Sequence, residues 1–94
     1  LAEKYNDFFK SIGMNFRTKT PNTDPNYWLM CVELNNKSER DEFIIETNKN
    51  GVSTRPIWKR NCSLPMYKNC FRDDQKNSKY LEKRIVNIPS SNLK

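Results

Sequence analysis

The chain has 94 residues, of which 35% are hydrophobic, and 17 Lys and Arg against 11 Asp and Glu give a net charge of +6. This length fits one domain, and a chain of this size buries only about two-thirds of its unfolded surface, so its core must be small. No apolar run approaches the roughly 18–20 residues of a membrane-spanning helix and no signal peptide is present, which favours a cytoplasmic protein without a membrane partner.

Cysteine content and charge distribution argue against three further classes. The three cysteines, Cys31, Cys62 and Cys70, are an odd number, unlike the disulfide framework of a secreted domain. The chain has no histidine and no C-x2-C pair, so we expect reduced, partly buried thiols and no metal site. Basic residues are spread along the chain without a run of five, which favours a solvated surface over a nucleic-acid-binding face.

The first predicted element is a helix over residues 2–12. Its apolar residues recur at three- and four-residue spacing: Tyr5, Phe8, Phe9 and Ile12. Gly13 is expected to stop the helix, and nothing caps its start after Leu1. We therefore expect this helix to continue from an earlier part of a longer protein.

A loop, a strand and a second helix follow. Residues 18–26 contain two prolines and predict a loop. Residues 27–34, YWLMCVEL, predict a strand whose near-continuous apolar character indicates that both faces are covered. Ser38 is the expected N-cap of a helix that ends before Gly51, because acids fill its first turn and Phe43 and Ile44 share one side.

The second half of the chain predicts two more strands around a short helix. Residues 52–58 read as a strand, but Pro56 cannot donate to a ladder, so this strand belongs at an edge. A helix over residues 77–84 and a last strand over residues 85–89 complete the order. We predict an α/β (α+β) fold in which helices pack on one face of a short sheet.

Four motifs in order carry a resemblance to a known family. A helix ending in N-K-N-G is followed by T-R-P-I-W, by L-P-M-Y-K-N-C and by R-I-V-N-I-P-S-S. As a set, within residues 27–91, they resemble the C-terminal end of the DegT/DnrJ/EryC1/StrS family. These pyridoxal-phosphate aminotransferases make amino sugars from keto sugar nucleotides, in pathways that supply surface polysaccharides.

The resemblance implies a small C-terminal domain of a fold-type I pyridoxal-phosphate transferase, spanning residues 1–94. Its parent would transfer an amino group from glutamate to a keto sugar nucleotide, with the cofactor as electron sink. In the family, the lysine that holds the cofactor lies in a large N-terminal domain, so this piece alone is expected neither to bind pyridoxal phosphate nor to be active. The implied partners are that missing domain, into which the helix of residues 1–13 would lead, the nucleotide-sugar substrate and a homodimer mate.

The resemblance also turns the segment from Thr54 to Tyr67 toward the active-site cleft. The candidate substrate-binding residues are therefore Arg55 and Trp58, with Lys59 adding charge beside Arg60. A guanidinium offers paired donors to an oxyanion, and an indole covers an apolar sugar face. The competing interpretation is that Arg55 pairs with a surface acid and Trp58 caps the small core.

The remaining residues of this region carry weaker expectations. Cys62 stands where many relatives have a histidine, which puts any histidine-dependent substrate contact in doubt. Residues 64–67, LPMY, are expected to pack, and Asp73 and Asp74 to solvate a loop or helix start. No residue is predicted to be catalytic, to bind the cofactor or to bind a metal.

Two other function classes stay open. A stand-alone basic nucleic-acid-binding module would stack Tyr27, Trp28 and Trp58 on single-stranded bases, and its affinity would fall steeply with salt. A non-catalytic structural or interaction domain would need no cofactor even in the complete protein.

Overall fold

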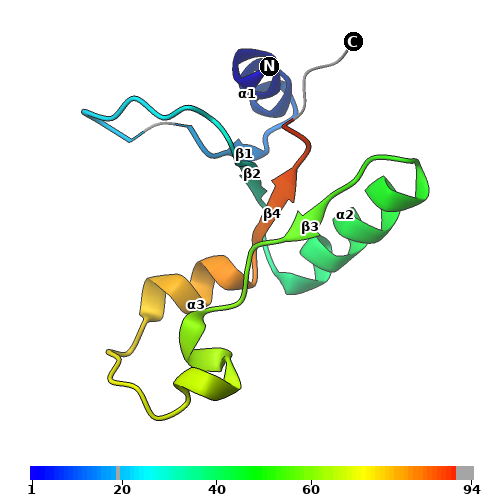
Figure 1. The fold of residues 1–94 in the computed structure, drawn as a ribbon. Coiled ribbons are helices and arrows are strands. Elements are labelled where there is room, and N and C mark those ends of the chain that lie inside the picture. Colours follow the sequence, from blue (N-terminus) through cyan, green and yellow to red (C-terminus); the bar gives the residue numbers. More distant parts are fainter. Residues whose placement is uncertain (19, 91–94) are drawn as a thin grey trace.

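The computed structural model describes residues 1–18 and 20–90, and in these residues three helices surround a four-stranded antiparallel sheet (Figure 1). The helices are α1 (Ala2–Ser11), α2 (Lys37–Lys49) and α3 (Lys76–Glu82), and the 3₁₀ turns are η1 (Asn61–Ser63) and η2 (Pro65–Tyr67). The strands are β1 (Asn15–Phe16), β2 (Met30–Glu33), β3 (Arg55–Pro56) and β4 (Ile85–Ile88), in spatial order β1-β2-β4-β3. The predicted mixed α/β class is confirmed.

The register of the strands divides their residues between two faces. Val32 pairs with both Phe16 and Val86, and all three side chains are buried. Asn87 pairs with both Cys31 and Arg55 in the neighbouring row. Cross-strand partners share a face of the sheet, and successive residues alternate between the two faces. The side chain of Arg55 therefore leaves the backbone on the face opposite the core.

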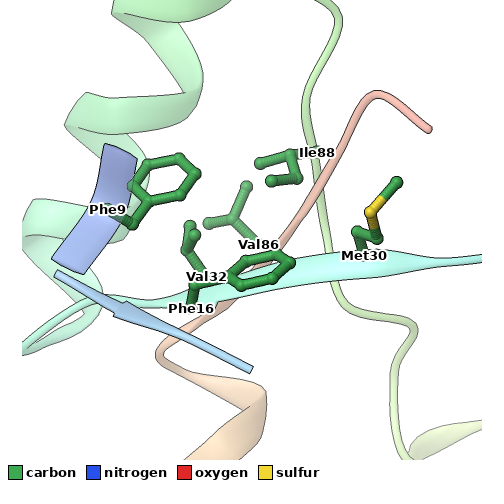
Figure 2. Packing of buried hydrophobic residues seen from close by; sticks show 6 residues of the cluster. All are labelled: Phe9, Phe16, Met30, Val32, Val86 and Ile88. Carbon is green, nitrogen blue, oxygen red and sulfur yellow. The ribbon is translucent and has the colours of Figure 1, made fainter. Parts of the chain in front are cut away.

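The core is one small cluster between the sheet and two helices. Figure 2 shows its buried members: Phe9, Phe16, Met30, Val32, Val86 and Ile88. Phe9 comes from α1, whereas Phe43 and Ile44 of α2 pack against the cluster while remaining partly exposed. Helices α1 and α2 thus cover one face of the sheet, as predicted.

Helix α3 departs from the prediction that the helices share one face. It contributes no residue to the core cluster within the described chain, and it lies at the opposite end of the structure from α1 (Figure 1). Its Tyr80 hydroxyl donates to Glu33 at 3.4 Å, on the face away from Val32. The expectation for Asp73 and Asp74 is confirmed, since their carboxylates accept the backbone N–H groups of residues 75 and 76 where this helix starts.

The predicted strand of residues 27–34 is wrong in length and in burial. Tyr27 has a left-handed φ of +54°, so its backbone is not extended, and β2 begins only at Met30. Trp28 and Leu29 are 72% and 49% exposed, and β2 itself alternates between buried and half-buried residues. Only one face of this strand is fully buried, and the apolar run consists of a turn followed by a short strand.

The starts of both later helices also differ from the prediction. The N-cap of α2 is Asn36 rather than Ser38, and its side chain accepts the backbone N–H of Glu39 at 2.8 Å. Helix α3 begins one residue earlier than expected, after Gln75 in a left-handed conformation with a φ of +51°. The end of α2 is as predicted, because Gly51 follows it with a φ of +83°.

The edge strand of residues 52–58 is confirmed in place but shortened to two residues. Pairing with β4 includes Arg55 and Pro56 and is followed by a hydrogen bond from Ile57 to Ile85 at 3.2 Å, so the Pro56 nitrogen, which has no N–H, faces the open edge of the sheet. Strand β1 and the two 3₁₀ turns were not predicted.

Candidate functional site

Arg55 is exposed, and its guanidinium is held by the last turn of α2. Its Nη1 donates to the amide oxygen of Asn48 at 3.1 Å and to the carbonyl of Thr54 at 2.8 Å. Neither acceptor is an acid, and the structure gives Arg55 no ion pair within the described residues. The interpretation that Arg55 pairs with a surface acid is therefore wrong.

Thr54 fixes the backbone from which Arg55 projects. Its residue is only 1% exposed, and its hydroxyl shares a hydrogen bond with that of Thr47 at 2.6 Å. The Asn48 amide nitrogen donates to the Thr54 hydroxyl at 3.1 Å and to its carbonyl at 3.2 Å. One side chain, Asn48, thus binds the strand with its nitrogen and the guanidinium with its oxygen. The sequence does not mark this residue as functional, although Asn48 lies within the N-K-N-G motif.

Trp58 is 74% exposed and does not cap the core, so the structural interpretation of this residue is also wrong. It follows the edge strand β3 after Ile57, where the chain leaves the sheet. An exposed indole is available to a ligand or to another protein surface.

Lys59 is exposed, but the structure does not gather it with Arg55. Lys59 shares a pocket with Lys37 and Arg40 at the start of α2, whereas Arg55 is bound to Asn48 near its end. Arg40 and Asn48 are eight residues apart, which corresponds to about 12 Å along a helix. Trp58 lies between these two positively charged positions in the sequence.

Arg60 joins the segment after Trp58 to helix α3 rather than standing free beside Lys59. Its backbone N–H donates to Glu82 Oε2 at 2.7 Å, and its Nε donates to the same oxygen at 3.2 Å. The backbone hydrogen bond, more than the charge of Arg60, holds the pKa of Glu82 below its usual value. Arg60 Nη1 and the Cys62 thiol both donate to Gln75 Oε1, at 3.1 and 3.0 Å.

Cys62 is therefore a half-buried hydrogen-bond donor that connects η1 to α3. The other two thiols differ in setting, because Cys70 is exposed and burial raises the pKa of Cys31. Among the described residues, no group of three or more Cys, Asp or Glu side chains is placed to hold a metal ion.

The expectation that residues 64–67 pack into the protein is contradicted for all of them except Leu64, which is half-buried. Met66 is 70% exposed and Tyr67 44% exposed in the short turn η2. Phe71, which follows this turn, is fully exposed and was not singled out from the sequence. These apolar side chains form part of the surface.

Pyridoxal phosphate, the cofactor that the resemblance implies, does not fit the lysines of this chain. A lysine that forms a Schiff base must be desolvated or have its pKa lowered by its neighbours. Every lysine among the described residues is exposed, with none enclosed in the core. The described residues thus offer no attachment site, and we derive no step through the cofactor.

The chain matches the DegT/DnrJ/EryC1/StrS aminotransferase family over residues 1–93. No curated protein matches it. In the described part of the chain, none of the helices has both the length and the apolar character needed to cross a membrane. The match spans almost the entire sequence and includes the strand and loop that carry Arg55, Trp58 and Lys59. The chain therefore belongs to the DegT/DnrJ/EryC1/StrS aminotransferase family.

Proposed function

We propose that this chain is the substrate-facing small domain of an aminotransferase that moves an amino group from glutamate to a keto sugar nucleotide. Membership of the aminotransferase family supports the reaction class. The observation that supports the substrate class is the state of Arg55, which is exposed, anchored by Asn48 and not neutralised by a described acid. The product would enter amino-sugar and surface-polysaccharide synthesis in the cytoplasm.

Arg55 is suited to bind an oxyanion such as a phosphate of the sugar nucleotide. Both of its hydrogen bonds in the structure use Nη1. A guanidinium has five N–H donors, so the edge formed by Nε and Nη2 is free to make the paired contacts that phosphate oxygens accept. Because Asn48 already restrains the guanidinium, less conformational entropy is lost when a ligand binds.

Trp58 supports the same proposal through its exposed ring. A sugar presents an apolar face, which an indole covers while its N–H remains available for a hydrogen bond. Lys59 contributes a second positive charge near the start of α2, whereas Arg55 is bound near the end of this helix. This spacing suits an elongated ligand that carries more than one anionic group.

The cofactor and the rest of the active site belong, in this proposal, to other parts of the protein. Pyridoxal phosphate would supply the electron sink and would be held by a large N-terminal domain, with a homodimer mate completing the site. The contribution of this chain is to bind and orient the substrate through Arg55, Trp58 and Lys59.

The test uses the protein at its full natural length, incubated with pyridoxal phosphate and reduced with borohydride. We expect mass spectrometry to find a stable cofactor adduct on one lysine. We also expect Arg55→Ala to raise KM for the nucleotide sugar about tenfold, as the loss of a charged hydrogen bond would. A folded protein without the adduct would overturn the proposal and leave a nucleic-acid-binding or structural role.

Asn50→Ala serves as the matched control for Arg55→Ala. Within the described residues, the Asn50 side chain donates only to the carbonyl of Glu46, one turn earlier in the same helix. Its removal changes the same end of α2 without touching Arg55, so KM should stay within about twofold of the unmodified protein. Equal effects of the two substitutions would indicate that Arg55 acts only through the stability of the domain.

A further inference from the structure

Three elements meet around the pocket that contains Lys59. Lys37 and Arg40 come from the start of α2, Glu82 and Lys83 from the end of α3, and Pro56 and Ile57 from strand β3 and the residue after it. The pocket has a volume of about 280 Å³. This volume is just below the roughly 300–1,000 Å³ typical of small-molecule sites, so the pocket suits one or two phosphate groups rather than a whole nucleotide.

The charges of this pocket are unbalanced. Arg40 is compensated by Asp41, whose carboxylate accepts from Nη2 at 2.9 Å, and Glu82 by Arg60. The other positive charges of the pocket have no ion pair in the part of the chain that the structure describes. They belong to Lys37, Lys59 and Lys83. Three ammonium groups around one small pocket repel one another, and a multivalent anion relieves this repulsion.

The walls of the pocket are held in place without a ligand. The Arg40 side chain is only 14% exposed, and its Nη1 donates to the carbonyl of Glu82 at 2.8 Å, which fixes the start of α2 against the end of α3. Glu82 in turn accepts the backbone N–H of Arg60, close to Lys59. The lysine stems therefore project from backbones that are already linked.

We propose that this pocket, lined by Lys37, Lys59 and Lys83, binds a phosphate group at a site separate from Arg55. The inference deepens the proposed function, and it rests on that function only for the larger ligand that carries the phosphate. The pocket adds two lysines, Lys37 and Lys83, that the sequence does not mark as functional. Arg40 and Glu82 position its walls.

The experiment is a calorimetric titration of the full-length protein with inorganic pyrophosphate, at low and at physiological salt. We expect saturable binding that weakens with salt, because charge attraction drives it. The double variant Lys37→Ala, Lys59→Ala should bind about tenfold more weakly, as the loss of charged hydrogen bonds predicts. Lys59→Arg alone, which keeps the charge, should bind nearly as well as the unmodified protein.

Lys49→Ala is the matched control, since Lys49 is an exposed residue of α2 that does not line the pocket. Pyrophosphate affinity that is unchanged in the double variant, or reduced equally in the control, overturns the phosphate site. That result also removes the support for Lys59 as a substrate-binding residue, but it leaves the proposed reaction and the role of Arg55 in place, because the cofactor adduct and the Arg55 variant test them separately.

Steady-state kinetics with the nucleotide sugar identify the source of the phosphate. A higher KM for the nucleotide sugar in the double variant, with kcat preserved, supports a phosphate of the substrate as the ligand. An unchanged KM beside weakened pyrophosphate binding overturns the connection with the substrate.

Discussion

The hydroxyl of Thr54 stabilises the junction between α2 and β3 from which Arg55 projects. We expect Thr54→Val to destabilise the protein by about 1–3 kcal/mol, because the buried Thr54 hydroxyl is lost together with its part-buried hydrogen bonds to Thr47 and Asn48. The free energy of unfolding measured with denaturant tests this. Thr54→Ser keeps the hydroxyl and should recover most of the loss, and a valine variant as stable as the serine variant would contradict the expectation.

Glu82 makes the stability of the η1–α3 junction depend on pH. The Arg60 backbone N–H lowers the pKa of Glu82 from its usual 4.5, so the folded state binds this proton less tightly than the unfolded chain does. The resulting stabilisation is fully present above pH 4.5 and is lost as the pH falls through the lowered folded pKa.

Glu82→Gln tests this dependence. At pH 7 we expect the variant to be less stable by about 1 kcal/mol, a small value because the carboxylate is partly solvated. The difference from the unmodified protein should shrink in acid as Glu82 becomes protonated. Unfolding measured between neutral and acidic pH gives both stability differences. A difference that stays constant over that range would exclude the ionisation of Glu82 as the source of the pH dependence.

Two residues near the start of α2 are candidates for its N-cap. Asn36 accepts the backbone N–H of Glu39, whereas Ser38 lies inside the first turn. We expect Asn36→Ala to cost about 1 kcal/mol of stability and Ser38→Ala almost nothing. Thermal unfolding of the two variants provides the comparison. A larger loss for Ser38→Ala would show that the helix begins where the sequence pattern predicts.

Long elements were predictable from the sequence, and short ones depended on distant contacts. The apolar spacing of its residues identifies α1, whereas α2 is identified by an acid in its first turn and by Gly51 after its end. Strands β1 and β3 have two residues each and exist only because β2 and β4 pair with them. No periodicity is visible in two residues, which explains why β1 was missed and β3 was overextended.

The candidate site also combines residues that a local sequence motif indicates with a residue that only distant contacts reveal. Arg55, Trp58 and Lys59 were selected from a local motif, and the structure places all three on the surface. The support of Arg55 by Asn48 arises because the chain turns at Gly51 and runs back along α2. Local spacing does not reveal which helix residue faces the returning strand, so Asn48 could be found only in three dimensions.

The whole molecule is open for its mass. Its radius of gyration is 14.8 Å, whereas a compact domain of this length has about 12 Å. Its accessible surface is 7759 Å², against about 5,700 Å² for a compact monomer of 11.2 kDa. A surplus of this size is comparable to the total area buried in a standard protein interface, so a larger assembly would cover it.

We therefore expect the 94-residue chain by itself to associate with other copies or to be only marginally stable. Phe8 and Ile12 are 56% and 53% exposed near the end of α1, and Trp28 and Leu29 are exposed before β2. Apolar side chains grouped in this way favour self-association in water.

Sedimentation velocity over a range of concentrations should show an average mass that rises with concentration. The double variant Trp28→Ser, Leu29→Ser should lower that mass more than Val52→Ser, which removes one exposed apolar side chain elsewhere in the sequence. A monomer with one sharp, concentration-independent unfolding transition would contradict this expectation, because it would show that the small core suffices without a covering surface.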